Sequence, residues 1–189
     1  MRTVFVISGP TNAGKTTVVG RLLNDNLGLT RVITSTSRAP RDNEVDGVDY
    51  HFFSREKFEN KINNNEFFEW ANVYNDFKGI LKKSLYEDIP MDKNIVITLD
   101  VQGFMNIKRN IDKNIYRVVG IFISPPSMEE LKNRMDKRGQ NLDDAELRLS
   151  IAKEEMEYKN LYDYAVINDD LEKCVDEIKE IIKKEDLIA

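Results

Sequence analysis

The stretch Gly9-Pro10-Thr11-Asn12-Ala13-Gly14-Lys15-Thr16 follows the apolar run Val4-Phe5-Val6-Ile7-Ser8 and leads directly into Thr17-Val18-Val19-Gly20-Arg21-Leu22-Leu23. It matches G-x-x-x-x-G-K-[ST] at every fixed position, with a strand before it and an amphipathic helix after it. The two glycines let backbone N–H groups point at phosphate oxygens, at a helix N-terminus that carries about half a positive charge. A random match in a chain of this length has a probability on the order of 1%. The stretch therefore predicts a phosphate site in which Lys15 reaches the β- and γ-phosphates and the Thr16 hydroxyl holds Mg²⁺.

Length and composition indicate a small soluble enzyme. The 189 residues are enough for one compact α/β domain with one or two inserted subdomains. A net charge of −5 and a pI near 5.1 argue against a nucleic-acid partner or an anionic membrane surface. The single cysteine, Cys174, excludes an internal disulfide, and Met1-Arg2-Thr3 opens on a strand without a signal segment. We therefore expect a cytoplasmic protein.

Strands and helices alternate along the chain, which predicts a parallel sheet covered on both faces. The expected strands span residues 3–8, 30–36, 50–53, 67–74, 95–100, 118–124 and 163–168. Helices are expected at residues 15–24, after Ser54, from about Gln102, at 128–137, around Arg148 and from about Leu171. We find no repeats, linkers or low-complexity tracts.

Two features of the amino-terminal half suggest an anion site and a polar specificity site. Arg38 and Arg41 lie on a loop after a β-branched strand, where they form either a fork around an anion or a solvated basic turn. Glu69 lies between Phe68 and Trp70. A carboxylate against apolar surface is costly unless it accepts hydrogen bonds, and the alternative is that strand alternation turns it to solvent.

The carboxyl-terminal half offers an acid at a strand end and a group of arginines. Asp100 ends an apolar strand, where it either reaches a Mg²⁺ shell beside the phosphate loop or caps the next helix. Arg134, Arg138 and Arg148 surround a glycine-interrupted polar segment, which fits a mobile lid over phosphates or a solvated pair of charged helices. His51, the only histidine, is interpreted as a half-buried strand residue.

These stretches resemble the guanylate kinase family over nearly the whole chain, in the family order and at compatible spacing. Besides the phosphate loop, Arg134, Arg138 and Arg148, the resemblance rests on Thr34-Ser35-Thr36-Ser37-Arg38-Ala39-Pro40-Arg41, Glu44-Val45-Asp46-Gly47-Val48-Asp49-Tyr50, Phe68-Glu69-Trp70-Ala71, Leu99-Asp100-Val101-Gln102-Gly103, Pro125-Pro126-Ser127 and Val166-Ile167-Asn168-Asp169.

The resemblance implies a P-loop NTPase-type parallel sheet with helices on both faces. Residues 1–33, 91–134 and 151–189 would form the core, residues 34–90 an inserted GMP-binding subdomain, and residues 135–150 a lid. It implies transfer of the γ-phosphoryl group of Mg-ATP to GMP, giving ADP and GDP. The expected partners are ATP and GMP, without nucleic acid or membrane, and the expected assembly is a monomer or homodimer.

The resemblance also implies roles for individual residues. The residues expected to bind ATP are Gly9, Pro10, Thr11, Asn12, Ala13, Gly14, Lys15, Thr16, Thr17, Arg134, Arg138 and Asn168. The residues expected to bind GMP are Thr34, Arg38, Arg41, Tyr50, Glu69, Lys78, Ile80 and Asp100. The expected catalytic residues are Lys15, Arg38, Arg134, Arg138 and Arg148. Thr16 and Asp100 are expected to bind Mg²⁺. Glu69 would accept from guanine N1–H and N2–H, two donors that adenine lacks.

The chain departs from the family pattern at two places. Lys78-Gly79-Ile80 stands where the family has Tyr-Gly-(Ser/Thr), and Thr98 replaces the first acid of the Asp-x-Asp strand end. We expect Lys78 to hold the acceptor phosphate as a point charge, and Ile80 to lie near the guanine edge without a hydrogen bond to give. Two other functions follow: a binding module without turnover, whose known examples typically lack the phosphate loop, and a kinase of another acceptor such as ribose 1,5-bisphosphate, which offers Glu69 no matching donors.

Overall fold

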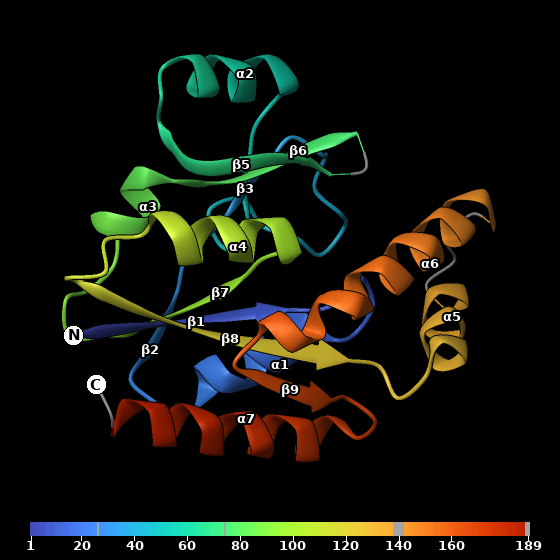
Figure 1. The fold of residues 1–189 in the computed structure, drawn as a ribbon. Coiled ribbons are helices and arrows are strands. Elements are labelled where there is room, and N and C mark those ends of the chain that lie inside the picture. The colour runs from blue at the N-terminus through green and yellow to red at the C-terminus, as the bar shows by residue number, and fades with distance from the viewer. Residues whose placement is uncertain (26, 74, 138–141, 188–189) are drawn as a thin grey trace.

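A sheet of five parallel strands forms the centre of the protein, in the order β2-β7-β1-β8-β9 (Figure 1). The computed structural model describes residues 1–25, 27–73, 75–137 and 142–187, without the side chains of residues 142–145. The strands are β1 (Arg2–Ser8), β2 (Leu29–Arg31), β7 (Asn94–Thr98), β8 (Tyr116–Ser124) and β9 (Tyr164–Ile167). The prediction of a parallel sheet with helices on both faces is confirmed.

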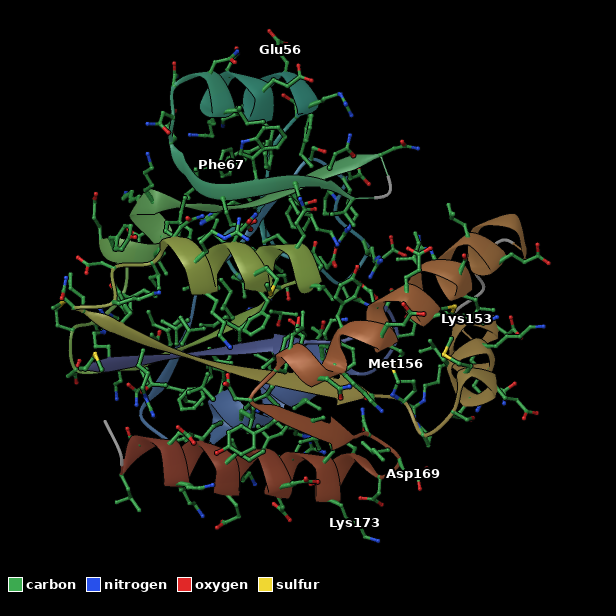
Figure 2. The ribbon with its side chains drawn as sticks, viewed as in Figure 1. Glu56, Phe67, Lys153, Met156, Asp169 and Lys173 are labelled. Atoms are coloured by element: carbon green, nitrogen blue, oxygen red, sulfur yellow. The ribbon has the colours of Figure 1, made fainter. Side chains whose placement is uncertain are left out.

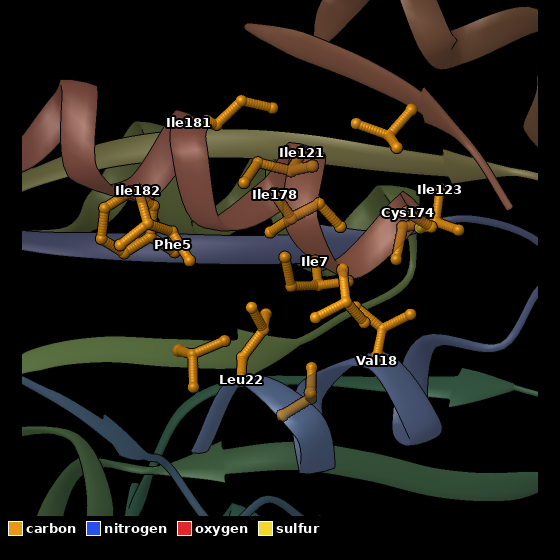
Figure 3. Packing of buried hydrophobic residues seen from close by; sticks show 14 of the residues in the cluster. Phe5, Ile7, Val18, Leu22, Ile121, Ile123, Cys174, Ile178, Ile181 and Ile182 are labelled. Atoms are coloured by element: carbon orange, nitrogen blue, oxygen red, sulfur yellow. The ribbon is translucent and has the colours of Figure 1, made fainter. Parts of the chain in front are cut away.

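Alternate residues of the central strands face different helices. Phe5 and Ile7 of β1 pack against α1 (Lys15–Asn24) and α7 (Leu171–Asp186) on one face (Figure 3). Val4 and Val6 point to the other face, where α4 (Val101–Asn110) covers them. All four side chains are fully buried, which explains why β1 has a continuous apolar sequence instead of an alternating one. Cys174 belongs to the first cluster and is a core residue, as predicted.

A second, smaller sheet lies above α4 in Figure 1, with strand order β4-β3-β6-β5. Its elements are β3 (Ser35–Thr36), β4 (His51–Phe52), α2 (Arg55–Asn63), β5 (Phe67–Val73), β6 (Asp76–Leu81) and α3 (Lys82–Tyr86). Phe58 of α2 stacks on Phe67 with ring centroids 4.3 Å apart, and Phe77 completes this small core. The Ser54 hydroxyl caps α2 by accepting a hydrogen bond from the Lys57 N–H. The small sheet thus has an aromatic core of its own.

The prediction of one strand over residues 30–36 is wrong, because this run is divided between the two sheets. Leu29–Arg31 pairs with β7, whereas Ser35–Thr36 pairs with β4 and β6. The Val32 N–H donates to the Val96 carbonyl, and the Thr36 hydroxyl donates to the Phe77 carbonyl. A β-branched run satisfies the local preference of either sheet, so propensity alone does not reveal the crossing.

Two helices pack together beside the carboxyl ends of the central strands (Figure 1). They are α5 (Met128–Asp136) and α6 (Leu142–Glu157), joined by the buried side chains of Leu131, Met135 and Ala152. The 3-10 turn η1 (Tyr158–Leu161) follows α6. No helix in the described part of the chain is both long enough and apolar enough to cross a membrane. The carboxyl ends of parallel strands are where ligands bind in open α/β sheets, which directs attention to this edge.

Candidate active site

The phosphate loop connects β1 to α1 and depends on two glycines in left-handed conformations. Gly9 has φ 138° and Gly14 has φ 96°, values that L side chains rarely adopt. A Cβ on Gly9 would lie 2.1 Å from the Ile123 carbonyl oxygen, and a Cβ on Gly14 would lie 2.2 Å from Asn168 Nδ2. The loop is therefore shaped by its own backbone and fitted closely against β8 and the residues after β9.

Lys15 and Asn168 hold this loop through its carbonyl groups. The Lys15 ammonium donates to the carbonyls of Gly9 and Pro10, at 2.5 and 2.7 Å. Asn168 Nδ2 donates to the Ala13 carbonyl at 2.8 Å, and Arg134 Nη2 donates to the Asn168 carbonyl at 2.9 Å. Asn168 is buried, so in this structure it supports the loop from behind.

A cavity of about 200 Å³ opens between the phosphate loop and the small sheet. Its walls include most of the predicted site residues: Gly9, Thr11, Asn12, Gly14, Lys15, Thr16, Thr17, Thr34, Arg38, Arg41, Tyr50, Glu69, Lys78 and Asp100. Residues far apart in sequence thus converge on one space at the carboxyl edge of the central sheet. The remaining predicted residues, Pro10, Ala13, Ile80, Arg134, Arg148 and Asn168, are not in its lining, and Arg138 lies outside the described residues.

The two arginines of the small-sheet side share one carboxylate. Arg38 forms a bidentate ion pair with Glu44, with distances of 2.6 and 2.7 Å. The Arg41 N–H donates to Glu44 at 2.9 Å, and the Arg41 guanidinium lies 3.9 Å from the same carboxylate. The guanidinium of Arg38 also lies 5.3 Å from the centre of the Tyr50 ring. The hydrogen bond from Arg38 lowers the pKa of Glu44, and the same bond raises the pKa of Arg38.

Glu69 lies in β5 and lines the cavity. Its Oε2 atom is buried without a hydrogen-bond partner among the described residues. Burial, with repulsion from the Asp100 charge, raises the pKa of Glu69 to about 7. The alternative of a solvent-facing Glu69 is therefore wrong, and the side chain has hydrogen-bonding capacity left for a ligand.

Asp100 caps a helix, as one of its two predicted roles required, and it also lies at the cavity. Its carboxylate caps α4 by accepting from the Gly103 N–H at 2.8 Å, and it also lines the cavity with Thr16. The described residues contain no group of three His, Cys, Asp or Glu side chains that could hold a metal ion. Mg²⁺ in phosphate-transfer sites takes only one or two protein oxygens and completes its shell with water and substrate phosphates. Thr16 and Asp100 fit such a site.

Lys78 and Ile80 point to different environments. The ammonium of Lys78 lines the cavity, and burial lowers its pKa against the opposing effect of Asp100. Ile80 is fully buried in the apolar cluster that includes residues of α4, together with Leu85 and Ile97. The position predicted to lie near the guanine edge is therefore a core position in this structure.

The sequence analysis missed Glu155 of α6. Its side chain lines the cavity, and its Oε2 is buried without a hydrogen-bond partner among the described residues. Burial raises the pKa of Glu155 to about 7, and the charge of Lys15 opposes this effect. The run Lys153-Glu154-Glu155 resembles a solvated helix face, and only the apolar neighbour Met156 hints that one of these acids turns inward.

The phosphate loop lies at the carboxyl edge of a parallel sheet, and its lysine and threonine line the cavity. These features define a P-loop nucleotide-binding protein. A family model described as guanylate kinase matches residues 1–185. The chain belongs to the guanylate kinase family.

Individual relatives agree with this assignment. The chain is 40% identical over 183 residues to a guanylate kinase of Clostridium tetani, covering 96% of this chain and 86% of the relative. It is 38% identical over 187 residues to a guanylate kinase of Wolbachia pipientis, covering 97% and 90%. The crystal structure of guanylate kinase from Anaplasma phagocytophilum is similar with a TM-score of 0.79 and 32% identity, covering 97% of this chain and 86% of that one.

Proposed function

We infer that this protein transfers the γ-phosphoryl group of ATP to GMP, giving ADP and GDP. The observation that carries the inference is the Glu69 carboxylate in the same cavity as Lys15, with its Oε2 atom buried and without a hydrogen-bond partner among the described residues. Guanine offers two adjacent N–H donors to such a carboxylate, whereas adenine and a sugar phosphate offer no such pair. A complete phosphate loop also favours turnover over a binding module without activity.

On the donor side, we propose that the backbone of residues 9–16 cradles the ATP phosphates. Lys15 would then exchange its bonds to the Gly9 and Pro10 carbonyls for bonds to phosphate oxygens. The ammonium would offset the negative charge that develops during transfer. Thr16 and Asp100 would hold Mg²⁺, which when bound would supply positive charge against the phosphates.

On the acceptor side, we propose that Arg38, Arg41, Tyr50 and Lys78 hold the GMP phosphate. The pairing of Arg38 with Glu44 fixes one edge of the guanidinium and directs it across the Tyr50 ring. Arg41 is 62% exposed, so it is able to turn toward a phosphate without first leaving a buried site. Catalysis then consists of alignment and charge neutralisation, without a covalent intermediate.

We also propose that residues 34–90 and 135–150 close over the two nucleotides, with Arg134, Arg138 and Arg148 as lid cations. Support comes from the separate aromatic core of the small sheet and from the position of α5 and α6 beside the cavity edge. The acidic composition and single cysteine are compatible with a cytoplasmic enzyme that acts as a monomer or homodimer on free nucleotides.

The test is an ADP-release assay with ATP and Mg²⁺ against GMP, AMP, CMP, UMP and ribose 1,5-bisphosphate. We expect turnover with GMP to exceed that with AMP by at least about a hundred-fold, because a buried carboxylate facing the wrong base edge stays unsatisfied. Higher turnover with ribose 1,5-bisphosphate than with GMP would reject the assignment of the acceptor.

A further inference from the structure

Gly103, in the first turn of α4, is a buried glycine at a position whose backbone does not require one. Its φ lies outside the left-handed region, which is where glycine has its advantage over other residues. Alanine also stabilises a helix relative to glycine. The presence of a glycine here therefore needs a different physical reason, and its neighbours supply one.

The space beside Gly103 is bounded by three side chains of the cavity wall. A Cβ at this position would lie 3.3 Å from Leu99 Cβ, 3.4 Å from Asp100 Oδ1 and 3.5 Å from Glu69 Oε1. These three residues all line the cavity. Side chains fill the region between α4 and β5, where Figure 2 labels Phe67. Gly103 thus lies behind the wall, at the point where α4 meets the small sheet.

Two of the three neighbours have fixed positions. Asp100 Oδ1 accepts from the Gly103 N–H at 2.8 Å, and the Leu99 N–H donates to the Ile7 carbonyl at 3.2 Å. The Glu69 carboxylate is at the end of a flexible side chain, and its Oε2 has no hydrogen-bond partner among the described residues. A methyl group added at Gly103 would therefore be accommodated mainly by displacement of the Glu69 carboxylate.

We propose that Gly103 is a positioning residue for guanine recognition, because its lack of a side chain lets the Glu69 carboxylate take the place from which it accepts both guanine donors. The proposal rests on the function proposed above, since it takes GMP as the acceptor. Gly103 touches neither nucleotide in this scheme. Two hydrogen bonds to one base edge require both carboxylate oxygens to be aligned with it, so a small shift weakens the pair more than it weakens a single bond.

Gly103→Ala tests this role by adding one methyl group. We expect KM for GMP to rise about five-fold, while KM for ATP stays within about two-fold. Gly20→Ala is the matched control, because it makes the same change in α1 at an exposed position where an added Cβ meets no described heavy atom within 4 Å. It should leave both KM values unchanged.

Comparison with IMP separates a role in recognition from a role in packing. Hypoxanthine lacks the 2-amino group of guanine, so IMP offers the Glu69 carboxylate only the N1–H donor. Misalignment should therefore cost GMP more than IMP. We expect the ratio of kcat/KM for GMP to kcat/KM for IMP to fall about three-fold or more in Gly103→Ala. A general loosening of the fold would lower both values together and leave this ratio unchanged.

A double-mutant cycle tests whether Gly103 acts through Glu69. In the Glu69→Gln background we expect Gly103→Ala to change kcat/KM for GMP by less than about two-fold, because the carboxylate that it positions is already absent. Thermal melting of every variant verifies that it is folded.

Three results would overturn the proposal. These are an unchanged or higher ratio of GMP to IMP turnover in Gly103→Ala, an equal loss in the parent and Glu69→Gln backgrounds, and the loss of cooperative melting in Gly103→Ala, which would assign this glycine to packing alone. Turnover of GMP by the parent is measured first. Its absence would reject the proposed function, whereas an unchanged ratio in an active parent rejects only the role of Gly103.

Discussion

The two walls of the cavity are built in different ways. The phosphate-loop wall consists of one continuous stretch, residues 9–16, whose backbone N–H groups and left-handed glycines form the site. The opposite wall consists of side chains from separate elements, among them Arg38 after β3, Glu69 on β5 and Lys78 on β6. The first wall needs only local geometry to be correct, whereas the second needs the whole small sheet to be assembled.

The difference also appears in how polar groups are satisfied. In the phosphate loop, Lys15 and the carbonyls of Gly9 and Pro10 satisfy one another. On the opposite wall, Glu69 keeps a buried oxygen without a partner among the described residues. The polar groups of the phosphate loop are therefore already hydrogen-bonded to one another. The opposite wall contains an unsatisfied polar group, whose chemistry selects the ligand.

The largest expected effect comes from Lys15→Ala. Lys15 is the residue that we propose to face the transferred phosphoryl group, so we expect kcat to fall at least about a thousand-fold while the fold is retained. Steady-state kinetics and thermal melting measure the two properties, and the exposed Lys153→Ala serves as the control. Activity within about ten-fold of the parent would mean that Lys15 does not face the transferred phosphate.

The second effect concerns Glu69→Gln. The amide accepts one of guanine's two donors and presents its own N–H₂ to the other, so we expect GMP affinity to fall about 10- to 100-fold. ATP affinity should change by less than about two-fold, because the backbone wall does not depend on Glu69. Calorimetric titration of each nucleotide separates the two, and equal losses for both would remove Glu69 from the acceptor wall.

A third prediction follows from the pKa of Glu69, which is about 7 in the folded protein and about 4.5 when unfolded. Between these two values the folded state binds more protons, so Glu69 lowers the free energy of unfolding as pH rises from about 4.5 through about 7. Glu69→Gln cannot ionise and avoids this loss.

We therefore expect the stability of Glu69→Gln relative to the parent to increase by up to about 3 kcal/mol between pH 4.5 and pH 8. Denaturant unfolding at both pH values measures it, with the exposed Glu157→Gln as the control. A relative stability that does not depend on pH would show that folding does not raise the pKa of Glu69.

The smallest effect on activity is expected from Ile80→Thr. This substitution tests whether Ile80 belongs to the apolar core or to the cavity wall. Ile80 is fully buried among apolar side chains, so a hydroxyl there should destabilise the protein by about 1–3 kcal/mol. KM for GMP should stay within about two-fold, because Ile80 does not line the cavity. Ile80→Val, with an expected loss of about 0.5–1.5 kcal/mol, is the matched control. A several-fold lower KM for GMP in Ile80→Thr would show that this position contacts GMP.

The same contrast explains how much of the molecule the sequence predicts. The phosphate loop is local, so its motif indicates both the geometry and the chemistry of Gly9, Gly14 and Lys15. Helix α1 was predicted with the bounds that the structure has, Lys15–Asn24. Asp100 was expected either to cap a helix or to reach a Mg²⁺ shell; it caps α4 and lines the cavity, and its contact with Mg²⁺ stays a prediction.

Features that depend on tertiary pairing could not be predicted from the sequence. The division of residues 30–36 between two sheets depends on β7 and β6, which lie more than forty residues further along the chain. Strand β6 contains Lys78 and Gly79, neither a strong β-former, and escaped prediction for that reason. The inward turn of Glu155 depends on the way α6 packs, and its charged neighbours conceal it.

The close fit of the phosphate loop has a consequence for biosynthesis. Residues 9–16 leave the ribosome well before Ile123 and Asn168, yet Gly9 rests against the carbonyl of Ile123 and the Ala13 carbonyl is held by Asn168. Contacts of such sequence separation form late, since the loop-closure entropy must be met before they contribute. A nascent chain that carries the complete motif therefore has no finished nucleotide site until β8 and the residues after β9 have emerged.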